Sequence, residues 1–197
     1  MSDQAMSKEV LDQLFCTART AHGFLPGSLP EGTVDRLFEL AQWGPTAFNA
    51  LPARFVFIQS REARERLLPS LSPGNLAQTL AAPLTIIVAY DLKFYEHLPR
   101  LYPAYDARKL YVGNPQLAEQ VAFRNSTLQG AYLMMAARAL GLDVGPMSGF
   151  NADKLNHEFF PDGRWKANFL VNVGVADPAS FYPRGPRLTF EEGAELL

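Results

Sequence analysis

The chain of 197 residues contains a single cysteine, Cys16, and no long apolar run. One cysteine cannot form an internal disulfide, and scarce cysteine is typical of a reducing compartment, so we expect a cytoplasmic protein. A membrane-spanning helix needs roughly 20 consecutive apolar residues, and no segment approaches that length. The first residues, Met1–Gln4, also lack the basic start and apolar stretch of a secretory signal. We therefore expect no membrane partner.

The sequence also lacks an excess of either charge. Its 18 Lys and Arg residues face 20 Asp and Glu residues, which gives a formal net charge of −2. Nucleic-acid-binding domains usually present a basic surface, so we expect no nucleic-acid partner. The histidines His22, His97 and His157 lie far apart and lack the spacing of a zinc site, so we expect no metal.

Several enzyme motifs are absent as well. The chain has neither the Gly-x-Gly-x-x-Gly of a Rossmann dinucleotide site nor the Gly-Lys-Ser/Thr of a phosphate loop. Ser148 has Pro146 and Phe150 two residues away, where a serine hydrolase elbow requires glycines. Cys16 adjoins the apolar stripe of the first expected helix, so we expect a packed thiol. No side chain is therefore expected to act as an obligatory nucleophile.

The apolar content of 48% is sufficient to bury one sizeable core, and no repeat or linker divides the sequence. We expect residues 1–197 to form a single domain. Apolar periodicity and capping residues predict helices at 7–16, 32–43, 61–68, 73–81, 115–140 and 152–160. Runs of β-branched and aromatic residues predict strands at 54–59, 84–90 and 168–175. Helices mixed with three or four strands are typical of an α+β domain.

Two Gly- and Pro-containing segments, Trp43–Asn49 and Gly145–Phe150, are expected to be loops where regular structure stops. Gly has no Cβ and Pro fixes a turn, so the main chain of such loops can approach a flat, polar-edged ligand closely. Arg19 and Arg187, near opposite ends of the chain, could supply cations for a phosphate. Together these features suggest a flat, phosphorylated cofactor held by backbone and arginines.

The same segments occur in one order with two others, Arg19–Phe24 and Pro186–Glu192. Through them the chain, from about residue 12 onward, resembles the FMN-dependent nitroreductase family. The phrases Pro73–Leu76 and Ala122–Ser126 bring it nearest to the branch of that family that reduces malonic semialdehyde in pyrimidine degradation.

The resemblance implies a nitroreductase-like α+β fold: a central, mostly antiparallel sheet flanked by helices in an intertwined homodimer, with FMN at the subunit interface. Arginines would bind the phosphate, a loop of the second subunit would hold the flavin edge, and the loop after residue 145 would pass the reactive N5 edge. The residues that the resemblance assigns to FMN are Arg19, Thr20, His22, Pro45, Thr46, Asn49, Pro146, Met147, Ser148, Gly149, Arg184 and Arg187. His22 stands where the family often has a more basic residue, and Arg184 is displaced from the usual position.

The function expected from this resemblance is an FMN-dependent oxidoreductase that uses NADH or NADPH in a ping-pong cycle and reduces malonic semialdehyde to 3-hydroxypropanoate. One alternative is a broad-specificity reductase of nitro compounds or quinones. An alternative of another class is a dimeric flavin-binding module without turnover. The sequence does not indicate whether the protein prefers NADH or NADPH.

Residues 92–113 form an aromatic-rich stretch with prolines and three basic residues, Arg100, Arg108 and Lys109. In the family that the chain resembles, this insertion helps to cover the flavin. We hypothesise that the stretch is a lid and that one of its basic residues meets a carboxylate on the substrate. The polar Arg124–Ser126, which interrupts the apolar pattern of the long helix, is expected to belong to a subunit contact.

Overall fold

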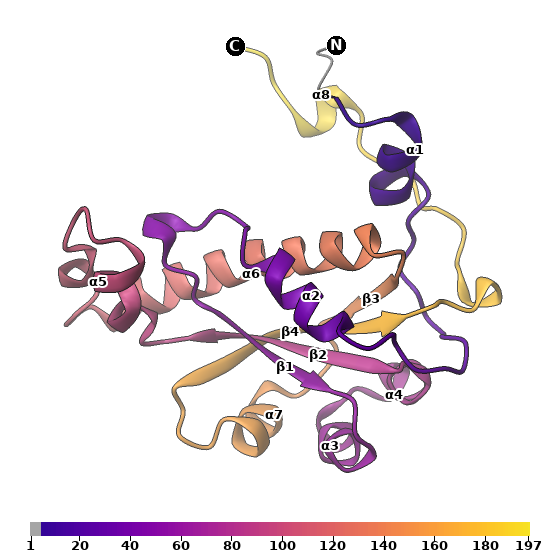
Figure 1. Ribbon diagram of the computed structural model, residues 1–197, viewed down its shortest axis with the longest axis horizontal. Coiled ribbons are helices and arrows are strands. Elements are labelled where there is room, and N and C mark those ends of the chain that lie inside the picture. The colour runs from indigo at the N-terminus through magenta and orange to yellow at the C-terminus, as the bar shows by residue number, and fades with distance from the viewer. Residues whose placement is uncertain (1–4) are drawn as a thin grey trace.

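The structure is a computed structural model, and it describes residues 5–197. Its centre is one four-stranded sheet in the order β1-β2-β4-β3, in which every neighbouring pair is antiparallel. The strands are β1 (Ala53–Ile58), β2 (Leu84–Asp91), β3 (Asp143–Met147) and β4 (Trp165–Gly174). Helices cover both faces of this sheet (Figure 1). The predicted α+β class and antiparallel sheet are confirmed.

Strand β2 is buried along its whole length because apolar layers meet it from both sides. Ile86 and Val88 pack in a core with α2 (Thr33–Ala41) and α6 (Pro115–Ala139). Their neighbour Ile87 faces the opposite core, which includes residues of the helices on the other face. Those helices are α3 (Arg61–Leu67), α4 (Pro73–Ala81) and α7 (Ala152–Phe159). Side chains of successive strand residues point to opposite faces, so one apolar run serves both layers.

The longest helix, α6, begins and ends at the residues that its sequence predicts. The Asn114 side chain accepts a hydrogen bond from the Leu117 N–H at 3.1 Å, and Pro115 occupies the first turn. Gly141 follows the last turn with φ of +76°, which glycine adopts without strain. The helix crosses the molecule over about 37 Å at 1.5 Å per residue, so it can connect distant parts of a site.

The expected loop at Gly145–Phe150 is wrong for its first half, since Gly145, Pro146 and Met147 belong to strand β3. Proline lacks a backbone N–H and is tolerated at a sheet edge, and β3 is an edge strand. Its outer side receives the N-terminal segment: the Ala21 N–H donates to the Val144 carbonyl at 3.0 Å.

The first expected helix is also different. It divides into α1 (Lys8–Leu11) and a π-helical turn at Asp12–Cys16, and the Cys16 thiol is exposed. The predicted packing of the Cys16 thiol is therefore wrong for a single copy of the chain. The apolar stripe of this segment faces away from the core, and Phe15 remains 56% exposed.

The stretch 92–113 forms short turns around α5 (Leu98–Leu101), with 3-10 segments at Phe94–His97 and Ala107–Leu110. Phe94, Leu98 and Tyr111 are buried against the first turns of α6. The remaining short elements are 3-10 turns at Ala47–Asn49, Leu68–Ser70 and Pro178–Ser180, and α8 at Phe190–Gly193. Among the described residues, no helix has the length and hydropathy needed to cross a membrane.

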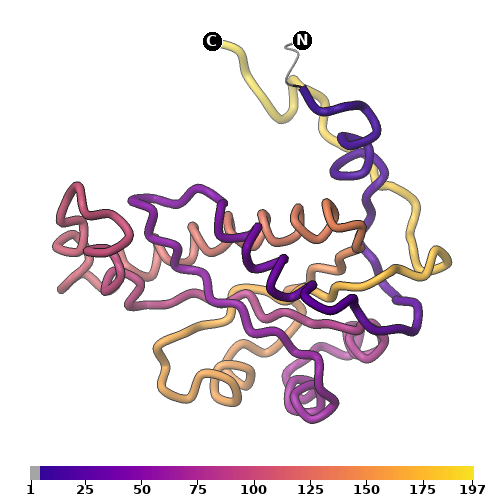
Figure 2. Tube along the Cα trace, in the orientation of Figure 1, coloured from indigo at the N-terminus to yellow at the C-terminus, as the bar shows by residue number. Residues whose placement is uncertain are grey.

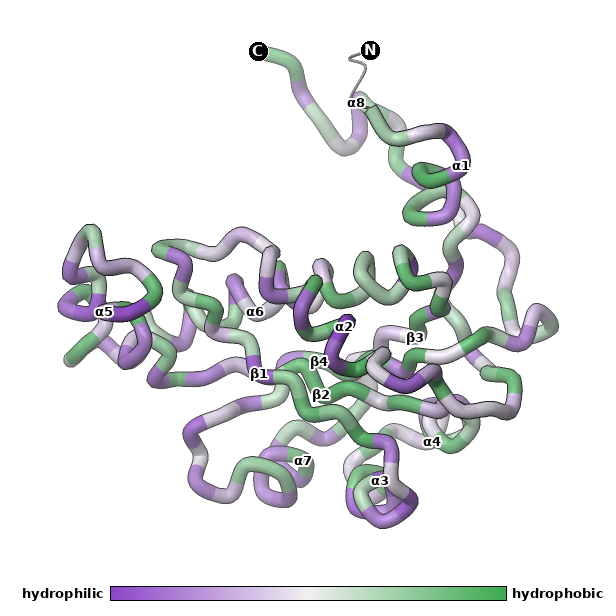
Figure 3. Tube along the Cα trace, viewed as in Figure 1, coloured by the Kyte–Doolittle hydropathy of each residue, from purple (hydrophilic) through white to green (hydrophobic). Residues whose placement is uncertain are grey.

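Both ends of the chain leave the sheet at the same side. Figure 2 shows α1 and the C-terminal arm running beside each other, away from the body of the molecule. The Arg184 guanidinium joins them by donating to the carbonyls of Cys16 and Ala18, the latter at 2.9 Å. Hydrophobic residues occur along α1 and at the end of the arm (Figure 3).

Candidate functional site

A cavity of ≈ 390 Å³ lies where the N-terminal segment, the last turn of α6 and the C-terminal arm meet. Its lining contains five potentially cationic side chains: Arg19, His22, Arg138, Arg184 and Arg187. No acidic residue lines it, and none of these arginines pairs with a carboxylate within residues 5–197. Cationic side chains gathered in a lining with no acidic residue repel one another, so the cavity is suited to an anion.

The arginines predicted from sequence use only part of their hydrogen-bonding capacity on the protein. Arg19 Nη1 donates to the Thr17 carbonyl at 3.2 Å, and Arg187 Nη1 donates to the carbonyls of Gly185 and Pro186, each at 3.0 Å. A guanidinium has five N–H donors, so several remain for a ligand. Paired donors of this kind match the oxygens of a phosphate.

Arg138 is the cavity residue that sequence reasoning missed. Its Nη1 donates to the Leu14 carbonyl at 3.0 Å, while its Nε is buried with no partner among the described residues. Burial lowers the pKa of Arg138, the charge of Arg184 lowers it further, and Asp143 opposes this effect. The available signal was an arginine in the last turn of an apolar helix, directly before the Gly141 stop.

The N-terminal wall of the cavity is held against strand β3. Thr20 forms a parallel bridge with Val144, and the next residue donates to the same strand. Gly145 permits this approach, because a Cβ at that position would lie 2.5 Å from the Ala21 carbonyl oxygen. The His22 ring lies against Tyr182 of the arm, with ring centroids 4.7 Å apart. Gly145 in strand β3 therefore allows the N-terminal wall of the cavity to lie in this position.

The segment containing Pro45, Thr46 and Asn49 lies elsewhere and has a strained backbone. Phe48, Asn49 and Leu51 have φ values of +53°, +50° and +41°, which are uncommon for residues with a Cβ. The Thr46 hydroxyl accepts from the Leu51 N–H at 3.1 Å, and Asn49 Nδ2 donates to the Leu101 carbonyl at 3.0 Å. Strain fixed by surrounding contacts is common at functional loops.

Asn125 explains part of this conformation. Its Oδ1 accepts from the Ala47 N–H at 2.8 Å, and its Nδ2 donates to the Val121 carbonyl at 2.8 Å. The side chain is 4% exposed. Within its own chain the Asn125 amide braces this loop, and the expected subunit contact of Arg124–Ser126 stays a prediction.

A third group follows strand β3. Met147 is buried, whereas Ser148 is exposed. Within residues 5–197, the N–H groups of Ser148 and Gly149 have no hydrogen-bond acceptor, although the Gly149 carbonyl accepts from the Ser72 N–H at 2.9 Å. Adjacent amides without acceptors are able to bind an electron-rich ligand edge.

These three groups do not converge on one point of a single chain. Along β3, Ser148 lies four residues beyond Val144, about 13 Å from the wall of the arginine cavity. Asn125 and Arg138, which mark the strained loop and the cavity, lie 13 residues apart on α6, or about 20 Å. Within one chain the free amides thus lie about one strand length from the cavity, and the loop with Thr46 and Asn49 lies far from the cavity.

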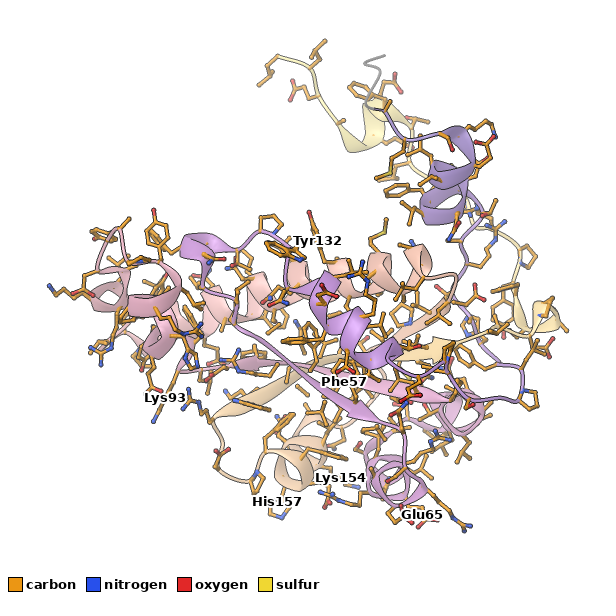
Figure 4. All side chains as sticks on the ribbon, in the orientation of Figure 1. Phe57, Glu65, Lys93, Tyr132, Lys154 and His157 are labelled. Atoms are coloured by element: carbon orange, nitrogen blue, oxygen red, sulfur yellow. The ribbon has the colours of Figure 1, made fainter. Side chains whose placement is uncertain are left out.

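The side of α6 that faces away from the sheet is apolar and exposed. Leu128 and Tyr132, one turn apart, are 46% and 44% exposed, and Trp43, which adjoins the Gly44 that contacts Tyr132, is 76% exposed. Figure 4 shows Tyr132 at the edge of α6 on the side where α1 and α8 lie. Large adjoining apolar side chains on a surface are typical of a protein interface.

Comparisons with known proteins agree with this geometry. The sequence profile described as "Nitroreductase family" matches residues 18–175. A Rhodopseudomonas palustris protein, provisionally named NADH dehydrogenase/NAD(P)H nitroreductase, is 53% identical over 187 residues, which is 95% of each chain.

The fold is shared with solved structures. A Bacillus subtilis protein provisionally named a nitroreductase has a TM-score of 0.84 to this chain at 22% sequence identity. The match covers 97% of this chain and 100% of the Bacillus subtilis chain. Another provisionally named nitroreductase, from Exiguobacterium sibiricum and crystallised with FMN, has a TM-score of 0.83 at 21% identity and covers 100% of both chains.

Proposed function

Because this chain belongs to the nitroreductase family, we propose that it is an FMN-dependent oxidoreductase that takes hydride from NADH or NADPH and passes it to a small-molecule acceptor. The observation that supports this most is the cavity of unpaired arginines about one strand length from unused amides. A phosphorylated, flat cofactor matches both ends of that arrangement. Bound FMN would supply the hydride chemistry, while the protein orients it and adjusts its reactivity.

Each part of the site suits one part of FMN. Arg19, Arg138 and Arg187 would bind the phosphate, and their unpaired state supports that role. The amides of Ser148 and Gly149 would donate to the polar edge of the ring. Arg184 holds the C-terminal arm against the N-terminal segment, so it mainly helps to shape the cavity.

The remaining predicted residues require a second copy of the chain. Thr46 and Asn49 lie too far from the cavity of their own chain to reach the same ring, and the exposed apolar side of α6 offers a surface for self-association. We propose a homodimer in which each loop completes the site of the partner. Cys16 and Phe15, exposed in one chain, would then lie beside the partner.

The test is the colour, mass and reactivity of the purified protein. We expect a yellow dimer that releases FMN on denaturation and is bleached by NADH or NADPH without oxygen. A protein that is a colourless monomer and does not bind added FMN would contradict the proposal. A yellow dimer whose flavin stays oxidised would instead identify a binding module without turnover.

For the acceptor, the finer proposal is malonic semialdehyde, with a broad nitro- or quinone-reductase as the alternative. A second cavity, of ≈ 420 Å³, supports an acceptor with a carboxylate, since His97 and Arg100 line it together with Arg54. Arg54 is already paired with Asp91 at 2.7 Å, whereas Arg100 has no carboxylate partner among the described residues. Arg100 is therefore the unpaired basic residue of the lid that lines this cavity.

We expect Arg100→Ala to raise the KM for malonic semialdehyde about tenfold or more, because one charge-assisted hydrogen bond is lost. Turnover of an uncharged nitroaromatic should not change. Lys109→Ala is the matched control, since Lys109 is paired with Asp106 at 2.9 Å. If wild-type protein reduces the nitroaromatic and ignores the aldehyde, the broad-specificity alternative is correct.

A further inference from the structure

The core contains a group of buried polar side chains that hydrogen-bond to one another. Thr79, Thr85 and Asn172 are fully buried, and Gln78 is 8% exposed. Thr85 Oγ1 donates to Asn172 Oδ1 at 2.7 Å, and Asn172 Nδ2 donates to Thr79 Oγ1 at 3.3 Å. Buried polar groups weaken a core unless every one is satisfied, so such a group suggests a positioning role.

From this group, contacts lead to the end of strand β3. Thr79 Oγ1 and Gln78 Nε2 both lie 3.8 Å from the Met147 sulfur. Gln78 Nε2 also donates to Asn75 Oδ1 at 2.7 Å. The oxygen of the Asn75 amide is thereby held toward Gln78, and its nitrogen is held toward the opposite side.

That nitrogen sets the backbone of the site. Asn75 Nδ2 donates to the Gly149 carbonyl at 2.8 Å, and the Ser72 N–H donates to the same oxygen at 2.9 Å. A Cβ at position 149 would lie 2.7 Å from Asn75 Nδ2, so the contact also requires glycine. The Gly149 carbonyl shares its peptide with the Phe150 N–H, which donates to the Ser148 carbonyl at 3.0 Å. Because the Ser148 carbonyl shares its peptide with the Gly149 N–H, fixing Gly149 restrains the turn that presents the N–H groups of Ser148 and Gly149.

We propose that Gln78 is a positioning residue that acts through Asn75 to hold these two amides ready for the polar edge of the flavin ring. This inference rests on the proposed FMN function. Gln78 does not line the arginine cavity, so we expect its effect at the ring end of the cofactor. The phosphate end and the ring end can therefore be separated by comparing FMN with riboflavin, which lacks the phosphate.

The first variant is Gln78→Met, which keeps the volume and removes the amide donor. We expect binding of FMN and of riboflavin to weaken by the same factor, about tenfold, because one hydrogen bond that orients the amides is lost. The reduction potential of the bound flavin should become more negative, since amides at the ring edge stabilise the charge added by reduction. The ¹⁵N shift of the Gly149 amide in flavin-free protein should also move.

The second variant is Gln78→Glu, in which protonation switches the donor on and off. An ionised carboxylate cannot donate to Asn75 Oδ1, whereas a protonated one can, and burial raises the pKa of a carboxyl group. Flavin affinity of Gln78→Glu should therefore recover toward the wild-type value as the pH falls. Gln78→Met should remain weak at every pH, and Gln59→Glu, which adds a carboxylate at an exposed position, should follow the wild type.

The outcomes are distinguishable from failure of the proposed function. If wild-type protein binds neither flavin, the function itself is wrong. If it binds both and Gln78→Glu shows no recovery at low pH, or if Gln78→Met weakens FMN but not riboflavin, the role given to Gln78 is overturned. Because the pH series is measured on one protein, a general loss of stability would not reproduce the recovery.

Discussion

The double variant Arg19→Met/Arg187→Met should bind FMN roughly 100-fold or more weakly than the wild type. Its binding of riboflavin should stay within about threefold of the wild-type value. Each arginine offers charge-assisted hydrogen bonds worth about 1.5–3 kcal/mol, and every 1.4 kcal/mol is about tenfold in affinity. Neither side chain has a carboxylate partner within the described chain, so no buried charge is left unpaired by the substitution. Flavin fluorescence titration of flavin-free protein measures both constants.

Arg138→Met extends this prediction to the residue that the sequence did not reveal. We expect it to reduce the preference for FMN over riboflavin about tenfold or more, since its buried guanidinium has an unused Nε beside the cavity. Arg66→Met is the matched control, because Arg66 pairs with Glu158 in a surface ion pair. Equal weakening of FMN and riboflavin by Arg138→Met would show that it only anchors the Leu14 carbonyl.

Gly145→Ala should destabilise the protein by about 1–3 kcal/mol and also weaken FMN binding, because the added Cβ forces the cavity wall away from β3. The Cβ would lie 2.5 Å from the Ala21 carbonyl oxygen, which is backbone and cannot rotate aside. The loss should fall on FMN more than on riboflavin, since the displaced segment contains Arg19. Thermal unfolding and the same titrations give the result.

Gly74→Ala provides the matched control for this change. A Cβ at position 74 would meet nothing within 4 Å, and the residue lies in helix α4 with no positive φ. Alanine is favoured over glycine in a helix by up to about 1 kcal/mol, so the control should be slightly stabilised. If both variants behaved alike, the close approach at Gly145 would not govern the cavity wall.

The sequence was informative wherever a local rule determines the structure. Helix α6 follows from Asn114, Pro115 and Gly141, each of which acts on its own turn. Strand β2 follows from an uninterrupted β-branched run that only a doubly covered strand can bury. Such features need no knowledge of distant residues, and their predicted ends differ from the structure by one residue or less.

Other features depend on contacts that no local pattern encodes. Pro146 suggests a loop, yet β3 accepts it because the strand lies at the edge of the sheet. The positive φ of Leu51 contradicts the preference of its residue type and is held in place by the Thr46 hydroxyl. In the sequence Arg138 is only a charged residue on a long helix, because the cavity it lines is formed by distant parts of the chain.

The apolar stripe of α1 shows a different limit on such prediction. Its spacing predicts a buried surface, but the spacing does not say which surface would cover it. The stripe is exposed in one chain, together with Phe123, Leu128 and Tyr132 of α6. A pattern that predicts burial therefore predicts a partner when the chain's own core does not receive it.

The arginine cavity takes two of its walls from residues 15–22 and 182–187, which lie far apart in the sequence. All four strands lie between these two segments in the sequence. A translation product that stops after Gly174 keeps every strand and loses Arg184 and Arg187. Cofactor binding is thereby tied to the presence of both wall segments, and chains shortened in this way would stay colourless.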